Sequence, residues 1–160
     1  MLFRSLIRDP CDAAVSHVAL AKEVQAVEHN ADAPIQLIPF QDQLDAWLTF
    51  YRSLEPYRDR MVVAPLRSVA NDMGHVIDRI NKRFGTDFER FDHTPDAVAK
   101  VHSEQGYHAG PSERRAALKE ETRADLDEHL HTDSSLRETV SDAEALYEDF
   151  IGDSAAVARS

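Results

Sequence analysis

The chain has 160 residues, of which 29 are acidic and 18 basic, and its formal net charge is −11. This charge argues against general nucleic-acid binding and against adhesion to anionic membranes, because both need a basic surface. The single cysteine, Cys11, excludes an intrachain disulfide and a thiolate metal cluster. No apolar run is long enough to span a bilayer. We therefore expect a soluble, cytoplasmic protein that buries a core of its own.

The first predicted element is a short apolar strand over residues 1–7, which ends at the turn signal Arg8-Asp9-Pro10. Asp9 suits the N-cap, and Pro10 the first position, of a helix that runs to about residue 29. A connection follows over residues 30–39. A second helix, over residues 41–54, is predicted from an apolar stripe with helical spacing, formed by Leu44, Trp47, Leu48 and Tyr51.

A second strand is predicted over residues 61–66, followed by a helix that Ser68 caps and Gly85 ends. The apolar stripe of that helix consists of Val69, Met73, Val76, Ile77 and Ile80. An aromatic cluster of Phe84, Phe88 and Phe91 is expected to pack on the core. Further helices are predicted over residues 95–105 and 112–131, separated by a loop over residues 106–111. A last amphipathic helix has an apolar face that contains Ala145, Leu146, Phe150 and Ile151.

This order of elements predicts the α/β class, mainly helical, with about two short parallel strands. A pair of strands leaves both of its outer edges unpaired, and parallel strands normally lie in a larger sheet with both faces covered. The sequence therefore predicts one domain over residues 1–152 that is part of a larger α/β fold, with a disordered tail over residues 153–160. Its partner would be either an N-terminal-half chain or a second copy.

Arg8 and Ser16 are the first candidates for binding chemistry. Ligands of open α/β sheets bind beyond the carboxyl ends of the strands, and a guanidinium there can grip a phosphate with two hydrogen bonds. A helix N-terminus and a serine hydroxyl would add further favourable contacts. The same residues also fit a plain helix entry in which Arg8 pairs with a carboxylate.

Several segments resemble PAPS-dependent sulfotransferases, whose donor is 3′-phosphoadenosine-5′-phosphosulfate (PAPS). Residues 8–17 (RDPCDAAVSH) look like the family's 3′-phosphate motif of Arg, Asp-Pro or Asn-Pro, and Ser. The C-terminal region of bacterial members is similar to residues 59–63 (DRMVV) and 72–88 (DMGHVIDRINKRFGTDF). Shorter matches occur at Phe50-Tyr51, Phe91, His93-Thr94 and Leu146-Tyr147-Glu148. The likeness covers roughly residues 3–150.

The resemblance implies a partial P-loop-NTPase-like fold that binds only the 3′-phosphate end of PAPS and needs no metal. Arg8 and Ser16 would bind that phosphate. Arg114, Arg115 and Lys119 are candidates, by position, for the basic segment that many members add near the C-terminus. The alternative is an exposed helix, because the charges around Arg114 alternate in sign as on a solvated surface.

The sequence contains no Gly/Ser/Thr-rich loop with a Lys for the 5′-phosphosulfate, and no position that matches the family's catalytic base. The catalytic residues and the acceptor are therefore unknown, and we expect the isolated chain to be inactive. A non-catalytic helical interaction module or regulator on a decayed sulfotransferase scaffold is the alternative function, with an unrelated nucleotide-binding regulator a further one. The histidines, including His129 and His131, are interpreted as structural or surface residues, and Cys11 as buried and inert.

Overall fold

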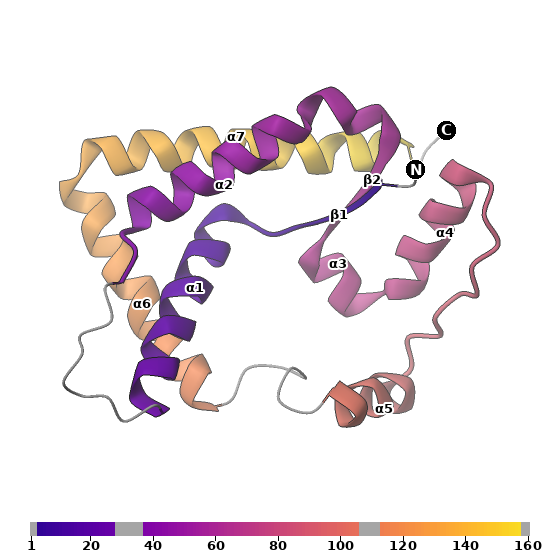
Figure 1. The fold of residues 1–160 in the computed structure, drawn as a ribbon, viewed down its shortest axis with the longest axis horizontal. Helices are drawn as coiled ribbons and strands as arrows, with labels where there is room; N and C mark the ends of the chain where they lie inside the picture. Colours follow the sequence, from indigo (N-terminus) through magenta and orange to yellow (C-terminus); the bar gives the residue numbers. More distant parts are fainter. Residues whose placement is uncertain (1–2, 28–36, 106–112, 158–160) are drawn as a thin grey trace. The chain divides into compact units, whose positions relative to one another are not determined.

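The computed structural model describes residues 3–27, 37–105 and 113–157. These residues are mostly helical and contain two short strands (Figure 1). The chain divides into two compact units, each with residues from both halves of the sequence. Unit 1 comprises Met1–Arg8, Arg52–Gly110 and Leu146–Ser160, and unit 2 comprises Asp9–Tyr51 and Pro111–Ala145. The single domain over residues 1–152 stays a prediction.

Unit 1 contains a two-stranded parallel sheet. Strand β1 (Phe3–Ile7) pairs with β2 (Met61–Pro65) in one continuous register, from Phe3 opposite Met61 to Ile7 opposite Pro65. All five residues of β2 are buried, as expected for an apolar parallel strand with both faces covered. The mainly helical fold with two short parallel strands is thus confirmed.

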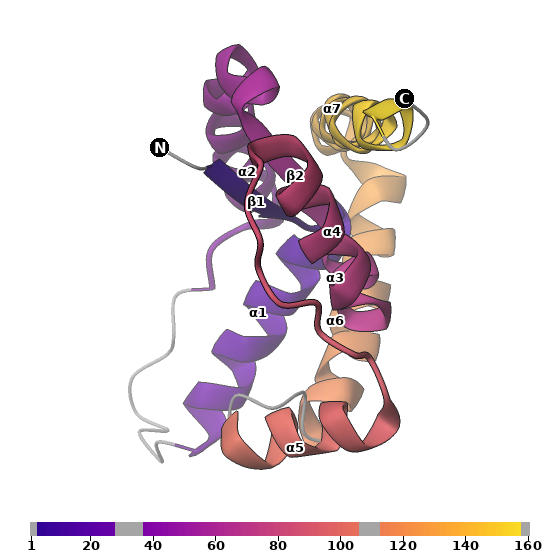
Figure 2. The same ribbon diagram turned by 90° about the vertical axis from the view of Figure 1, so that its right-hand side faces the viewer.

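Unit 1 also contains several helical elements. They include the 3₁₀ helix η1 (Glu55–Arg60) before β2, then α3 (Leu66–Asn71), α4 (Met73–Phe84) and α5 (Pro95–Gln105) after it. Figure 2 shows α3 and α4 after β2, and the extended segment that joins α4 to α5. Val62 and Ala64 of β2 form one buried cluster with Val76 and Ile80 of α4. The sheet and α4 therefore share a core.

The single predicted helix that begins at Ser68 is wrong, because the structure has two helices that meet at Asp72. Ser68 lies inside α3, and the Asp72 carboxylate accepts a hydrogen bond from the backbone N–H of His75 at 3.0 Å. An aspartate side chain competes for backbone N–H groups, so it starts helices better than it continues them. The predicted stop is confirmed, since Gly85 has a left-handed backbone with φ of 61°.

The predicted aromatic cluster is wrong for Phe88, whose side chain is 53% exposed. Phe84 packs against the core of unit 1, and Phe91 is partly buried. The difference has a local cause in Asn81 of α4. Its side-chain amide donates to the Phe88 carbonyl at 2.8 Å and accepts from the Phe88 N–H at 2.9 Å. These bonds hold the backbone of Phe88 against α4, while the ring remains exposed.

Gly74 of α4 lies against Arg90 and Phe91, in the segment that follows α4 and packs back on this helix. A Cβ atom there would be 2.5 Å from the Phe91 backbone oxygen and 3.0 Å from Nε of Arg90. We expect Gly74→Ala to lower the free energy of unfolding by about 1–3 kcal/mol through this clash. Thermal denaturation followed by circular dichroism measures the effect.

The matched control is Gly152→Ala in helix α7 (Ser134–Val157), where no atom lies within 4 Å of an added Cβ. That substitution should stabilise by about 0.5–1 kcal/mol, because alanine is the better helix former. If both substitutions stabilised the protein equally, the close approach of Phe91 to α4 would be refuted.

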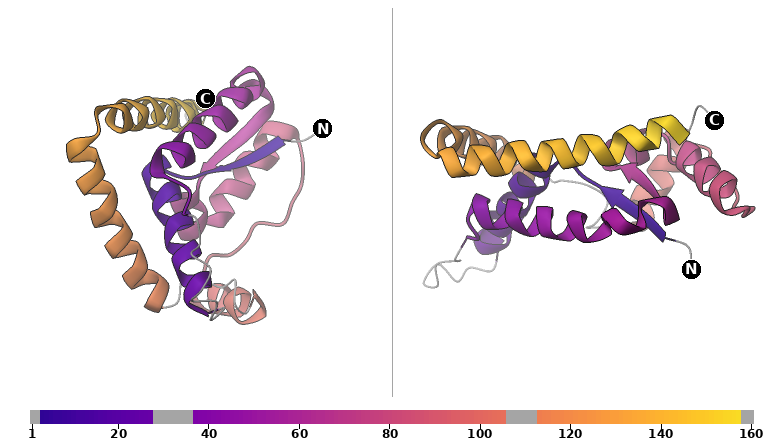
Figure 3. Two further views of the ribbon diagram at one scale, coloured as in Figure 1. Left: turned by 60° about the vertical axis from the view of Figure 1, so that its left-hand side comes forward. Right: turned by 90° about the horizontal axis from the view of Figure 1, so that it is seen from above.

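Unit 2 is helical. It contains α1 (Pro10–Val27), most of α2 (Phe40–Leu54), α6 (Glu113–Thr132) and the first part of α7. Helices α1 and α6 lie side by side (Figures 1 and 3). The predicted stripe of α2 is confirmed as buried core. The Asp133 carboxylate starts α7 by accepting from the N–H groups of Ser135 and Leu136 at 2.9 and 3.1 Å.

Helix α7 continues to Val157, past residue 152, where the sequence placed the end of the domain. The predicted loop over residues 106–111 and most of the connection over residues 30–39 lie outside the described residues. None of the helices described is long and apolar enough to cross a membrane.

Candidate functional site

The start of α1 has the capped geometry that the sequence predicted. The Asp9 carboxylate accepts a hydrogen bond from the Asp12 N–H at 2.9 Å, and the Asp9 carbonyl accepts from the Ala13 N–H at 2.8 Å. Pro10 occupies the first helical position, where its missing N–H costs nothing. Asp9 is therefore the N-cap of α1.

The two residues predicted to hold a phosphate fall in different units. Arg8 directly follows β1 in unit 1 and is partly buried, whereas Ser16 lies in α1 of unit 2. The Ser16 hydroxyl oxygen is buried and has no hydrogen-bond partner within the described part of the chain. Burying an unpaired hydroxyl is unfavourable, so a hydrogen-bonding group that reached Ser16 would recover a stabilising contact.

Negative charges surround the first turn of α1. The pKa of the Cys11 thiol is raised to about 11, first by burial and then by the charges of Asp9 and Glu144, with Arg123 opposing them. Cys11 is buried, as predicted, and such a pKa leaves little reactive thiolate at neutral pH. A phosphate near this turn would meet the same carboxylates, so the helix N-terminus contributes less than the sequence indicated.

Ion pairs join α1 to α6 within unit 2. Nζ of Lys22 lies 2.8 Å from Oε1 of Glu121 and 3.0 Å from Oδ2 of Asp125. The hydrogen bond to Glu121 is the main reason that the pKa of Lys22 is raised. At one end of the helix pair Arg123 pairs with Asp12.

The most buried of these pairs joins Nε of Arg115 to Oε2 of Glu23 at 2.5 Å, and both side chains are largely covered. Sequence reasoning missed the whole set of pairs. The alternating charges of α6 were visible, but their partners lie far away along the chain. Several charged residues of α6 thus form ion pairs with α1 and are not simply solvated.

The remaining predicted site residues lie on α6. Arg114 is exposed, which fits the alternative of a solvated helix, and Lys119 is partly buried. Arg115, the neighbour of Arg114, belongs to the ion pair with Glu23. The structure therefore distributes the three basic residues of this segment over different environments, and their role toward a phosphate stays a prediction.

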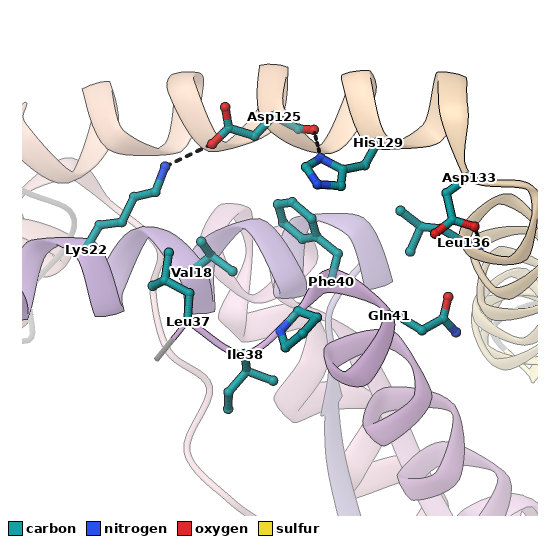
Figure 4. A pocket seen from close by; sticks show the side chains of 11 residues that line it. Val18, Lys22, Leu37, Ile38, Phe40, Gln41, Asp125, His129, Asp133 and Leu136 are labelled. Carbon is teal, nitrogen blue, oxygen red and sulfur yellow. Dashed lines mark hydrogen bonds and ion pairs between the residues drawn. The ribbon is translucent and has the colours of Figure 1, made fainter. Parts of the chain in front are cut away.

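A cavity of about 290 Å³ opens in unit 2 between α1, the start of α2 and the end of α6 (Figure 4). Its walls are mainly apolar, and its lining residues include Val18, Leu37, Ile38, Phe40 and Leu136. Lys22 reaches it already paired with carboxylates, as Figure 4 shows for Asp125. The cavity is therefore better suited to bind an apolar group than an anion. Ser16, Arg114 and Lys119 do not line it.

His129 lies at the edge of this cavity. Its Nδ1 is 2.7 Å from the Asp125 backbone oxygen, and its ring meets the Phe40 ring edge to face at 5.8 Å between centroids. A carbonyl accepts only from a protonated nitrogen, so Nδ1 carries the proton. In the described ranges no group of three or more His, Cys, Asp or Glu side chains could hold a metal ion.

Comparisons with protein-family models, with curated proteins and with solved structures found no match.

Proposed function

We propose that this chain is the C-terminal part of a sulfotransferase-type protein and that it binds the 3′-phosphate of an adenosine 3′,5′-bisphosphate through Arg8. The observation that carries the proposal is the junction between β1 and α1. A parallel strand ends at Ile7, Arg8 follows at once, and Asp9 and Pro10 start a helix. This arrangement supports a ligand beyond the carboxyl end of the strand.

Binding is the proposed activity, and sulfuryl transfer by this chain alone is not. The sequence contains no Gly/Ser/Thr-rich segment with a Lys that is typical of a 5′-phosphosulfate loop. Without donors at that end, the charge that develops on the transferred group would lack stabilisation. The carboxylates of Asp9, Asp12 and Glu144 would further weaken the affinity for an anion.

The test is isothermal titration calorimetry of the full chain with adenosine 3′,5′-bisphosphate. Because Arg8 would supply charge-assisted hydrogen bonds, we expect Arg8→Ala to weaken binding by about tenfold or more. Adenosine 5′-monophosphate, which lacks the 3′-phosphate, should bind more weakly by a similar factor. Arg67→Ala removes the same charge from an exposed position of α3 and should leave the affinity within twofold, about 0.4 kcal/mol. Equal binding by the wild type and Arg8→Ala would refute the proposal.

A second candidate is a non-catalytic interaction module, favoured by the apolar cavity of unit 2. At its rim the side chains of Leu37 and Ile38 are 38% and 57% exposed. Large exposed apolar residues beside an apolar cavity are typical of surfaces that receive a partner's side chain. Absence of bisphosphate binding at high protein concentration, together with concentration-dependent sedimentation, would favour this module. A compact monomer at all concentrations would count against self-association.

A further inference from the structure

Among the residues that the structure describes, two arginines of helix α4, Arg79 and Arg83, have no carboxylate partner. Arg79 and Arg83 are four residues apart, so they lie on the same face of the helix, about 6 Å apart along its axis. Both side chains are partly buried. Most other arginines with described contacts bind a carboxylate, as Arg90 binds Asp78, Arg115 binds Glu23 and Arg123 binds Asp12.

Arg83 is held in place by the backbone. Its guanidinium donates a hydrogen bond to the Asp59 carbonyl at the end of η1, while its Nε is buried without a partner among the residues described. A backbone carbonyl is neutral, so this bond orients the guanidinium and leaves its charge uncompensated. Arg83 therefore presents a fixed positive charge beside Arg79.

Arg79 has neither a hydrogen bond nor an ion pair in the part of the chain that the structure describes. Burial lowers its pKa, and no neighbouring carboxylate opposes that effect. Removing a guanidinium from water without a partner is costly. An anion that accepted its hydrogen bonds would offset this cost.

Two acidic residues near the pair already have other partners. Asp78 is bonded to Arg90, and the Asp72 carboxylate caps the helix at His75. Both acids are thus occupied by other groups. The chain has a net charge of −11, so Arg79 and Arg83 are not part of a generally basic surface. Their attraction for an anion is local.

We propose that Arg79 and Arg83 form a binding site for an oxyanion, a phosphate or sulfate group, held by two guanidinium forks. Planar guanidinium groups match the oxygens of such groups with paired hydrogen bonds. The site shares no residue with the phosphate contact proposed at Arg8 and does not depend on it. The oxyanion could be a free ion or part of a larger phosphorylated or sulfated molecule.

The test follows the Arg Nε–H resonances of the full chain by ¹H–¹⁵N NMR during titration with sodium pyrophosphate, inorganic phosphate or sulfate at constant ionic strength. Resonances of Arg79 and Arg83 should shift and saturate, whereas that of Arg67, an exposed arginine of α3, should not. Pyrophosphate that saturates well before inorganic phosphate and sulfate would identify a phosphorylated molecule as the source. Equal saturation by all three would identify a free oxyanion.

Variants separate the site from general charge effects. Arg79→Gln should weaken pyrophosphate binding by about tenfold, and Arg79→Lys, which keeps the charge but loses the fork, should weaken it by a smaller factor. Arg67→Gln removes the same charge from an exposed position and should bind as the wild type does. Small unsaturable shifts at all arginines, unchanged binding by Arg79→Gln, or loss of binding in Arg67→Gln would each overturn the proposal. The Arg79 variants leave the Arg83–Asp59 contact intact, so their folding can be verified by the unchanged Arg83 resonance.

Discussion

Replacement of Phe150 by alanine is expected to lower the free energy of unfolding by about 3–5 kcal/mol. Phe150 lies in the part of α7 that belongs to unit 1, and its side chain is 1% exposed. The guanidinium carbon of Arg58 lies 4.7 Å from the centre of its ring, a cation–π contact. Arg58 is itself fixed by hydrogen bonds to Asp149, at 2.5 Å to the carbonyl and 3.2 Å to the carboxylate. Truncation would thus leave a cavity and remove the surface on which Arg58 rests.

Urea denaturation followed by circular dichroism measures this loss, with Phe88→Ala as the matched control. Phe88 has the same side chain in the same unit, but it is 53% exposed and its backbone, not its ring, is bonded to Asn81. The control should change the free energy of unfolding by less than about 1 kcal/mol. Equal losses for the two variants would contradict the place of Phe150 in the core.

The second large effect is expected at Arg115. Arg115→Ala would remove the guanidinium that pairs with the largely buried carboxylate of Glu23, and removal of one member of a buried pair costs about 3 kcal/mol. Chemical denaturation at neutral pH gives the value.

Arg114 supplies the control for this prediction, since it is the adjacent residue of the same helix and is exposed. Arg114→Ala should change stability by no more than about 0.5 kcal/mol. The double variant Glu23→Ala/Arg115→Ala should be more stable than the sum of the two single losses implies, because no charge is left buried. If Arg115→Ala were as stable as Arg114→Ala, the ion pair would have no structural role.

Much of the secondary structure could be predicted because its causes are local. The apolar run of β2 and the stripe of α2 follow directly from residue spacing, and Pro10 and Gly85 mark a helix start and stop by their own backbone preferences. The start of a new helix at Asp72 also has a local cause, its capping side chain. The sequence did not identify it, because Ser68 is a second possible N-cap four residues earlier. Competing caps cannot be ranked without the packing of the residues around them.

The tertiary features could not be predicted in the same way. The exposure of Phe88 depends on the Asn81 side chain, and the buried pair of Glu23 and Arg115 joins residues far apart in the sequence. The environment of Arg79 and Arg83 in α4 could not be predicted either, because the sequence shows which residues are cations but not which carboxylates reach them. Charge patterns along one helix therefore identified candidates without their partners.

The most direct test of the central claim is a crystal structure of the chain with adenosine 3′,5′-bisphosphate. The account predicts that oxygens of the 3′-phosphate lie within about 2.7–3.2 Å of the Arg8 guanidinium nitrogens. A nucleotide bound elsewhere, or an Arg8 that does not contact the phosphate while the nucleotide saturates the crystal, would contradict it.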